Sequence, residues 1–355
     1  MNVLNDRKSF WQWIAITAPF ILFIPLLIFI LAVTVLSSKQ YDPDVTNVAF
    51  KIGSLSVAWY GIFIFLGFIL AIFIGCIKLW KVYKCPIDPF YWYCIMGIPG
   101  AILGARFWSC CIGDAQWNSF WSFREGGLAV QGGVILDVII AMIYFPLILK
   151  KPKYQVRDEL NEPAVVRQVS MWVYVDAIIP CILIGQVLGR YGNYMNQEVV
   201  GGMIDGEYAK FIQNLFPYMY IHDNPNFTGP NGVYQPFFFY ESFTNWFGLV
   251  FIYFIGELIP KKNCGDLGLG YFLWYGILRT IMNPFRYSQY AFNAGSLTFS
   301  IIWLVAAIVL IVLNHTVFPN LRKYKIWQPI CNLFRKNKKE DTMRTNEQML
   351  YYLGR

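Results

Sequence analysis

About eight apolar stretches run through this 355-residue chain, and each approaches the length needed to cross a lipid bilayer. Hydrophobic residues make up 57% of the sequence and charged residues only 14%, which excludes an ordinary soluble domain. Helices satisfy their own backbone hydrogen bonds in lipid, so runs of this length predict membrane helices. We therefore expect an all-α polytopic membrane protein with about eight transmembrane helices. The predicted spans are residues 10–36, 56–80, 90–107, 128–149, 169–188, 237–259, 267–282 and 297–318.

Lysine and arginine are concentrated in alternate connecting segments, and this asymmetry orients the spans. Cytoplasmic loops of membrane proteins carry the excess of these residues. Basic residues gather at 7–8, 78–84, 150–167 and 261–262, and a longer basic run follows Arg322. The pattern predicts a multi-pass protein of the cell membrane with both termini in the cytoplasm. It also accounts for the net charge of +8 without a nucleic-acid partner.

Several arginines remain on the side that this orientation disfavours. Those close to predicted outer helix ends are Arg106, Arg124, Arg190, Arg279 and Arg286. Topology gives no reason to keep them there, whereas a shared anionic ligand does, because guanidinium groups bind phosphate and carboxylate strongly.

The most unusual polar stretch, residues 189–201, directly follows the fifth predicted span. It places Arg190, two asparagines and Glu198 at the outer end of a membrane helix, where ionisable groups are expensive and usually functional. Arg190, Asn193 and Asn196 share one face of a continuing helix. Their guanidinium and amide groups suit a phosphate or glycerol oxygen. A helix cap with an interfacial arginine is the alternative interpretation.

A polar and aromatic segment at residues 201–235 lies on the predicted outer side and is rich in turn residues. It predicts a small extracytoplasmic cap over the helices. The chain has only two histidines, His222 and His315, so we expect no histidine-based metal site and no Ser-His-Asp triad. No metal or cofactor is implied.

Other polar and glycine-rich clusters fall on the same outer side. They lie at residues 59–61, 104–106, 124–133, 235–241 and 275–286. Two Gly-Gly pairs within 124–133 allow the backbone to approach a ligand closely. The alternative for these glycines, and for the GxxxG spacings at 100–104 and 185–189, is close helix packing. Tyr60 and Tyr240 have a similar alternative as interfacial belt residues.

Residues 189–198 followed by Gly201 resemble the signature of the prolipoprotein diacylglyceryl transferases. The resemblance extends in order to Trp59-Tyr60-Gly61, Gly104-Ala105-Arg106, Gly126-Gly127-Leu128 with Gln131-Gly132-Gly133, Pro236 with Tyr240-Glu241, and Tyr275-Gly276 with Arg279 and Arg286. It covers residues 54–318, taken here as a membrane core that includes the outer loop. Residues 1–53, an additional transmembrane anchor with an outer loop, and the basic cytoplasmic tail 319–355 lie outside it.

The resemblance implies a lipoprotein-forming reaction at the outer leaflet of a bacterial membrane. A diacylglyceryl group would pass from phosphatidylglycerol to the lipobox cysteine thiol of a preprolipoprotein, with release of glycerol phosphate. By motif, Arg190 and Arg279 are the expected phosphate-binding residues, and Glu198 and Gln131 join them as catalytic candidates. The expected substrate-binding residues are Tyr60, Arg106, Gly132, Gly133, Asn193, Asn196, Gly201, Glu241, Tyr275 and Arg286.

The chain departs from the family pattern at a few positions. Gln131 and Gln235 stand where the family commonly has histidine, and Asn283 stands where many members have glutamate. Glutamine cannot accept a proton as a general base. Glu198, Glu241 or a water molecule would then have to activate the thiol.

Two other functional classes stay open from the sequence. One is a different transferase that handles a lipid phosphate, and the other is a transporter of an anionic solute. Transport sites usually lie near the membrane midplane, whereas the polar clusters here lie at the outer end. Asp137 and Asp176 both lie within predicted spans, so a transporter remains an alternative interpretation.

Overall fold

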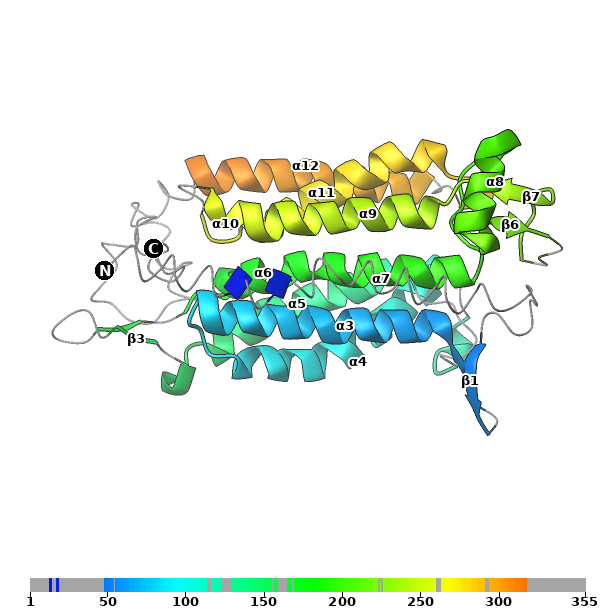
Figure 1. Ribbon diagram of the computed structural model, residues 1–355. Coiled ribbons are helices and arrows are strands. Elements are labelled where there is room, and N and C mark those ends of the chain that lie inside the picture. Colours follow the sequence, from blue (N-terminus) through cyan, green and yellow to red (C-terminus); the bar gives the residue numbers. More distant parts are fainter. Residues whose placement is uncertain are drawn as a thin grey trace.

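The structure is a computed structural model that describes residues 13–14, 17–18, 48–53, 55–113, 116–122, 129–154, 156–158, 165–167, 169–222, 224, 226–259, 263–290 and 294–317. Figure 1 shows long helices lying side by side, with a smaller unit of α8 and short strands at one end. The predicted first span and the basic tail lie almost wholly outside the described residues.

Apolar helices occupy the second to the eighth predicted spans in the part of the chain that is described. Their bounds are α3 Trp59–Ile77, α4 Asp88–Ile112, α5 Val130–Ile148, α6 Met171–Ile178, α7 Ile182–Met195, α9 Phe237–Leu249, α10 Gly256–Leu258, α11 Asp266–Met282 and α12 Ala294–Thr316. Short π-helical turns, Lys78–Val82 and Val250–Ile255, extend α3 and join α9 to α10. A 3-10 turn at Ile179–Cys181, which contains Pro180, joins α6 to α7. The helices at Trp59–Val82, Asp88–Ile112 and Met171–Met195 are long and apolar enough to cross a membrane.

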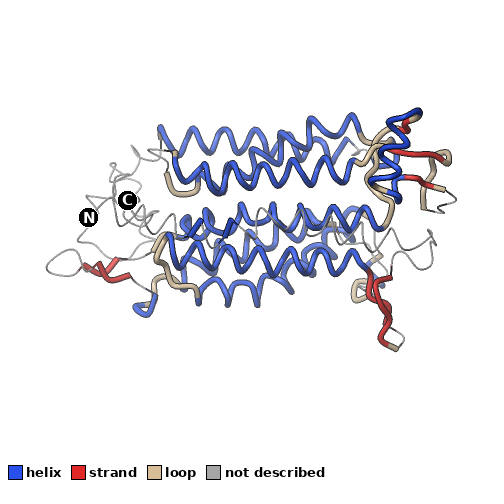
Figure 2. Tube along the Cα trace, in the orientation of Figure 1, coloured by secondary structure: helices blue, strands red, loops and turns tan. Residues whose placement is uncertain are grey.

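Short strands supplement the helices, so the all-α expectation holds for the bundle and not for its connections. They are β1 Val48–Ile52, β2 Leu55–Ala58, β3 Val156–Asp158, β4 Val165–Arg167, β5 Met203–Ile204, β6 Tyr220–Ile221 and β7 Gly232–Tyr234. β1–β2 and β3–β4 are antiparallel pairs, and β7 lies between β5 and β6. Figure 2 shows the strands only at the two ends of the helices. Together with α8, Gly206–Leu215, the third sheet makes residues 203–234 a compact unit at one end.

Glycines bring neighbouring helices into backbone contact. A Cβ built on Gly132 of α5 would lie 2.2 Å from the carbonyl oxygen of Gly104 on α4. One built on Gly67 of α3 would lie 2.9 Å from the Cα of Gly185 on α7. Helices in lipid associate through such close packing, because lipid tails provide no hydrophobic drive between them. The α4–α5 and α3–α7 pairs therefore depend on these small residues.

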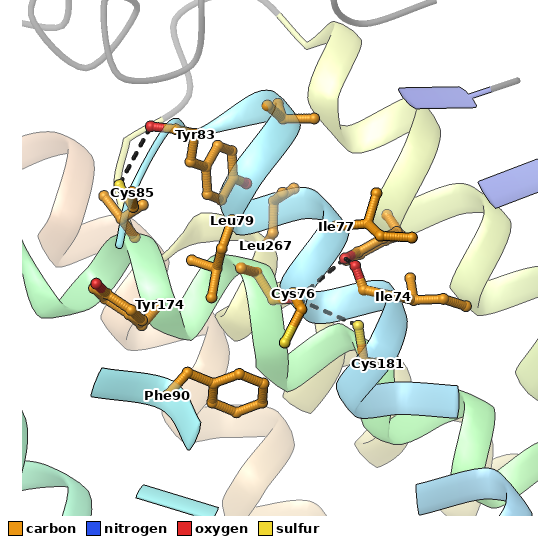
Figure 3. Close-up of a cluster of buried hydrophobic side chains, with 14 of the residues drawn as sticks. Ile74, Cys76, Ile77, Leu79, Tyr83, Cys85, Phe90, Tyr174, Cys181 and Leu267 are labelled. Carbon is orange, nitrogen blue, oxygen red and sulfur yellow. Dashed lines mark hydrogen bonds between the residues drawn. The ribbon is translucent and has the colours of Figure 1, made fainter. Parts of the chain in front are cut away.

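A buried apolar core fills the end of the bundle opposite α8. Figure 3 shows Cys76, Cys85 and Cys181 among apolar and tyrosine side chains, where these thiols serve as small apolar groups. Lys78 and Glu257 form a 2.7 Å ion pair at this end and are 0% and 3% exposed. The sequence grouped Lys78 with the basic residues at the end of the predicted span 56–80, and the structure shows that the helix continues past it and buries its side chain.

The start of α11 is capped by an acid from α6. Asp176 accepts backbone hydrogen bonds from Gly265 at 2.7 Å and from Leu267 and Gly268 at 3.0 Å each. These are the amides that a helix start leaves without an internal partner, and the helix dipole also favours a negative charge there. Asp176 is thus a structural residue that holds α6 to α11, which removes one reason for a transporter.

We predict that Asp176→Asn lowers the free energy of unfolding by about 1–3 kcal/mol, because buried amide donors lose a charged acceptor. Thermal unfolding of the purified protein in detergent measures the change. Glu207→Gln is the control, because Glu207 is an exposed acid in a surface pair with Lys210. That change should stay within about 0.5 kcal/mol. Equal melting temperatures for both variants would contradict the capping role.

Candidate functional site

The candidate site lies at the end of the bundle that carries α8 and β5–β7. The chain runs in alternate directions through successive helices, so the C-terminal end of α7 and the N-terminal end of α9 lie together beside α8 (Figure 1). The C-terminal end of α11 lies at the same place, because Arg279 in its last turn contacts Glu241 of α9. These ends carry most of the residues that the sequence singled out.

Glu241, in the first turns of α9, is the centre of the site. Its side chain is 2% exposed, and its Oε2 lies 2.6 Å from Arg190 Nη2. Arg286 donates from Nε to Oε1 at 2.8 Å and from Nη2 to the same oxygen. Arg279 Nη1 lies 3.8 Å from Oε2. One carboxylate of α9 thus gathers an arginine of α7 and two arginines from the end of α11 and the segment that follows it.

Positive charge is concentrated in this cluster. Among the described residues, three guanidinium groups lie within ion-pair distance of the Glu241 carboxylate. Guanidinium groups gathered in this way raise the local positive potential, which favours an anion at this place. The arrangement therefore has the electrostatics of a phosphate or carboxylate site.

Arg279 differs from its two neighbours. Its side chain is 15% exposed, against 11% for Arg190 and 4% for Arg286, and its contact with Glu241 is the longest. Its guanidinium lies over the Tyr275 ring, 5.1 Å from the centroid. The ring face attracts the cation, and the guanidinium fork suits recognition of a planar or tetrahedral oxyanion.

A second branch of the network leads from Arg190 to Glu198. Arg190 Nη1 donates to Asn193 Oδ1 at 3.0 Å, and Asn193 Nδ2 donates to Glu198 Oε2 at 3.2 Å. Asn196 Nδ2 donates to Glu198 Oε1 at 3.4 Å. The predicted common face of Arg190 and Asn193 is confirmed by their direct contact. The side-chain amides of Asn193 and Asn196 both donate hydrogen bonds to the Glu198 carboxylate.

Burial raises the pKa of the Glu198 carboxyl, and the hydrogen bonds from Asn193 and Asn196 oppose that rise. Tyr60 of α3 lies close enough to interact electrostatically with both Arg190 and Glu198. Its ring packs on Gly192, where a Cβ would lie 2.4 Å from the ring Cδ2. Gly192 is needed at that position because any side chain would displace Tyr60.

Gly201 joins the site through its backbone. Its amide donates to the Gln235 carbonyl at 3.1 Å, and it forms a β-bridge with Arg286. A Cβ on Gly201 would lie 2.9 Å from Gln235 Cβ. Gly201 therefore allows the segments before α9 and after α11 to meet, and this meeting brings Arg286 to Glu241.

Some predicted site residues are not part of this network. Arg106 is 2% exposed and donates from Nε to the Phe120 carbonyl at 3.1 Å and from Nη2 to Ser119 Oγ at 3.3 Å. It holds the loop that follows α4. Gly132 and Gly133 pack against the backbone of α4, as their alternative interpretation held. Contact of these residues with a substrate stays a prediction.

Several residues of interest lie partly or wholly outside the described part of the chain. The backbone of Gln131 belongs to the first turn of α5, but its side chain is outside the described part of the chain. Arg124 and the first Gly-Gly pair are outside it entirely. Asn283 is 9% exposed and begins a 3-10 turn after α11. The carboxylate that faces Arg279 comes instead from Glu241 of α9.

The sequence missed two polar residues behind Glu241. Ser242 donates to the Val187 carbonyl of α7 at 3.0 Å, and Asn245, one turn after Glu241, is 2% exposed. Their position within an otherwise apolar run was the available signal. In the described ranges, no group of three or more His, Cys, Asp or Glu side chains is placed to hold a metal ion.

Comparison with known proteins gives a consistent result. The family model described as prolipoprotein diacylglyceryl transferase matches residues 47–313. A protein of Malacoplasma penetrans is 48% identical over 303 residues, which cover 83% of this chain and 84% of that protein. A Ureaplasma urealyticum protein is 41% identical over 320 residues, with 86% and 93% covered.

A more distant relative from Enterococcus faecalis is 30% identical over 292 residues, with 79% of this chain and 94% of that protein covered. Each of these three relatives is named phosphatidylglycerol–prolipoprotein diacylglyceryl transferase. The arginine cluster and the 189–201 motif lie within the matched region. This membrane protein therefore belongs to the prolipoprotein diacylglyceryl transferase family, a family of transferases.

Proposed function

We propose that this protein transfers the diacylglyceryl group of phosphatidylglycerol to the lipobox cysteine of a preprolipoprotein at the outer leaflet. The cysteine sulfur forms a thioether bond to the glyceryl carbon, the carbon–oxygen bond to phosphate breaks, and glycerol phosphate leaves. The observation that supports this best is the cluster of Arg190, Arg279 and Arg286 around Glu241. Its concentration of guanidinium groups suits a leaving group that gains negative charge on phosphate oxygens.

Arg279 is the arginine that contacts the phosphate in this proposal. It is the most exposed of the three and the most loosely held by Glu241, so it can turn toward a ligand at the smallest cost. Arg190 and Arg286 hold Glu241 and keep the local charge positive. The Arg279 guanidinium lies over the Tyr275 ring, and Tyr60 is close enough to Arg190 to interact with it electrostatically.

Glu198 is the group that takes the thiol proton. It is a partly buried carboxylate held by two amides next to Arg190. Its raised pKa makes it a stronger base than an exposed glutamate, and a general base works best when its pKa approaches the operating pH. Gln131 donates a hydrogen bond to a phosphate or ester oxygen, the one role that glutamine shares with histidine.

The topology proposed for this chemistry has eight spans with both termini in the cytoplasm. The unit at residues 203–234 then forms a cap on the outer face, beside the arginine cluster. Residues 1–53 supply an additional anchor, residues 54–318 the membrane core, and residues 319–355 a cytoplasmic tail. This arrangement places the basic segments inside and the cluster at the leaflet where lipoproteins receive their lipid.

Arg279→Ala should lower the transfer rate by a factor on the order of 10² or more, because a preorganised contact to the leaving group is lost. Arg279→Lys should also lose most of the activity, because an ammonium cannot reproduce the guanidinium fork. The measurement is transfer from labelled phosphatidylglycerol to a lipobox peptide. Lys210→Ala is the control, since Lys210 is an exposed base of α8 paired with Glu207. Near-normal rates for both Arg279 variants would refute the phosphate assignment.

Gln131→His should change the rate only modestly, because the proposed base is Glu198. The rate of the natural protein should fall as the pH drops through the raised pKa of Glu198, since only the ionised carboxylate accepts a proton. Rate profiles against pH for both proteins test this. A new ionisation near the ordinary histidine value of about 6.5, with a gain of roughly a hundredfold, would show that a base had been missing.

A cysteine placed at Asn226 should react with a membrane-impermeant thiol reagent added outside intact cells, and one placed at Lys338 should react only after lysis. The reason is the distribution of basic residues along the chain. The natural cysteines are replaced by alanine in both variants. Labelling of both positions from the same side would contradict the proposed orientation.

A further inference from the structure

Glu198 stands between two residues in an unusual backbone conformation. Gln197 has φ of 53° and Val199 has φ of 57°. Residues other than glycine rarely adopt this left-handed region, and a β-branched residue such as valine adopts it least readily. Such conformations persist only when the surrounding structure fixes them, and they gather at functional sites. What fixes this turn therefore bears on what Glu198 can do.

The Gln197 side chain anchors the turn to the compact unit at residues 203–234, called the outer unit from here on because of its proposed location. It is 1% exposed, and its Nε2 donates to the carbonyls of Tyr218 at 3.1 Å and Tyr220 at 3.3 Å. Its Oε1 accepts from Asn224 Nδ2 at 3.0 Å. Both donors and the acceptor of the amide are thus in use, all with residues 218–224.

Two further anchors hold the turn on its other sides. The Glu198 amide donates to the Asn193 carbonyl at 2.8 Å, which ties the turn to α7. The Val200 carbonyl accepts from the Tyr287 amide at 2.9 Å, which ties it to the segment after α11. The side-chain amide of Gln197 links this turn to the 218–224 segment. Gln197 directly precedes Glu198 in the chain.

We propose that Gln197 is a positioning residue for diacylglyceryl transfer: its buried amide, held by residues 218–224, keeps the left-handed turn that presents Glu198 to Asn193 and Asn196 beside Arg190. This inference rests on the proposed function. Gln197 touches no reacting group and acts only through Glu198. The position of the outer unit on the bundle thereby determines the position of the Glu198 carboxylate, which takes the thiol proton.

Gln197→Gly is the most direct test, because glycine adopts a positive φ without strain and removes only the amide link. The matched control is Gln289→Ala. Gln289 is an exposed amide that binds the same outer unit, at Asn226 and Thr228, without touching the Glu198 turn. Transfer to a lipobox peptide should fall by roughly tenfold to a hundredfold in Gln197→Gly, as small displacements of a catalytic group do. Gln289→Ala should keep its rate within about twofold of the natural protein, because it leaves the carboxylate in place.

The pH profile separates positioning from general damage. Among the described residues, Tyr60 of α3 and Tyr290 of the segment after α11 interact electrostatically with Glu198, and Arg190 of α7 is linked to it through Asn193. In Gln197→Gly the carboxylate becomes more exposed, so the acid limb of the profile should move to lower pH. Glu198→Gln should remove that limb altogether, which assigns it to Glu198 and not to its neighbours.

The double variant decides whether Gln197 acts through Glu198. In the Glu198→Gln background, Gln197→Gly should cost less than about twofold, since effects transmitted through one group are not additive. Three results would each overturn the inference. They are an undiminished loss of rate on adding Gln197→Gly to Glu198→Gln, an acid limb that does not move in Gln197→Gly, and an equal loss of rate in Gln289→Ala.

Hydrogen–deuterium exchange gives a readout that does not depend on activity. Amides of residues 195–200 should exchange faster in Gln197→Gly than in the natural protein and Gln289→Ala, because the turn has lost an anchor. Unchanged exchange would overturn the positioning role. If the natural protein transfers no diacylglyceryl group to the peptide, the proposed function fails, and the exchange result alone then decides whether Gln197 holds the turn.

Discussion

The carboxylate of Glu241 is buried where α7, α9 and α11 meet, and the arginines of the site are arranged around it. A buried carboxylate without partners is unstable, and so is a cluster of buried guanidinium groups. Each therefore requires the other, and together they fix the helix ends at one place. The positive charge concentrated at this place is what the proposed reaction uses. In this sense the site and the fold at this end of the bundle depend on the same interaction.

The segment from α9 to α10 carries a buried acid at each of its ends. Glu241 pairs with arginines beside the unit at residues 203–234. Glu257 pairs with Lys78 at the opposite end, where the Tyr83 hydroxyl also donates to Glu257 at 2.5 Å. Lys78 follows α3 directly, so the Lys78–Glu257 pair joins α3 to α10. The contacts of Glu241 join α9 to α7 and α11 in the same way. Ion pairs hold the helices together at both ends of the bundle, and glycine contacts join α4 to α5 and α3 to α7.

The unit at residues 203–234 and the residues that flank it position the site in two ways. Gly201 and Gln235 bring the segments before α9 and after α11 together, which places Arg286 on Glu241. Gln197 connects the same unit to the turn that carries Glu198. The two halves of the proposed chemistry, phosphate binding and proton removal, are thus both positioned from outside the helices. The amide network formed by Arg190, Asn193 and Glu198 links the halves.

The sequence by itself determined the helical class, the apolar spans from the second to the eighth, and the identity of most residues in the cluster. Apolar length and local spacing are properties of the chain, which is why Arg190 and Asn193 could be placed on one face. The sequence could not show that Glu241 is the centre of the cluster, that Arg106 binds its own loop, or that Gly132 packs on α4. It also gave no sign of the left-handed turn at Gln197. These features arise from contacts between residues distant in the chain, and only the tertiary structure decides which buried charge meets which partner.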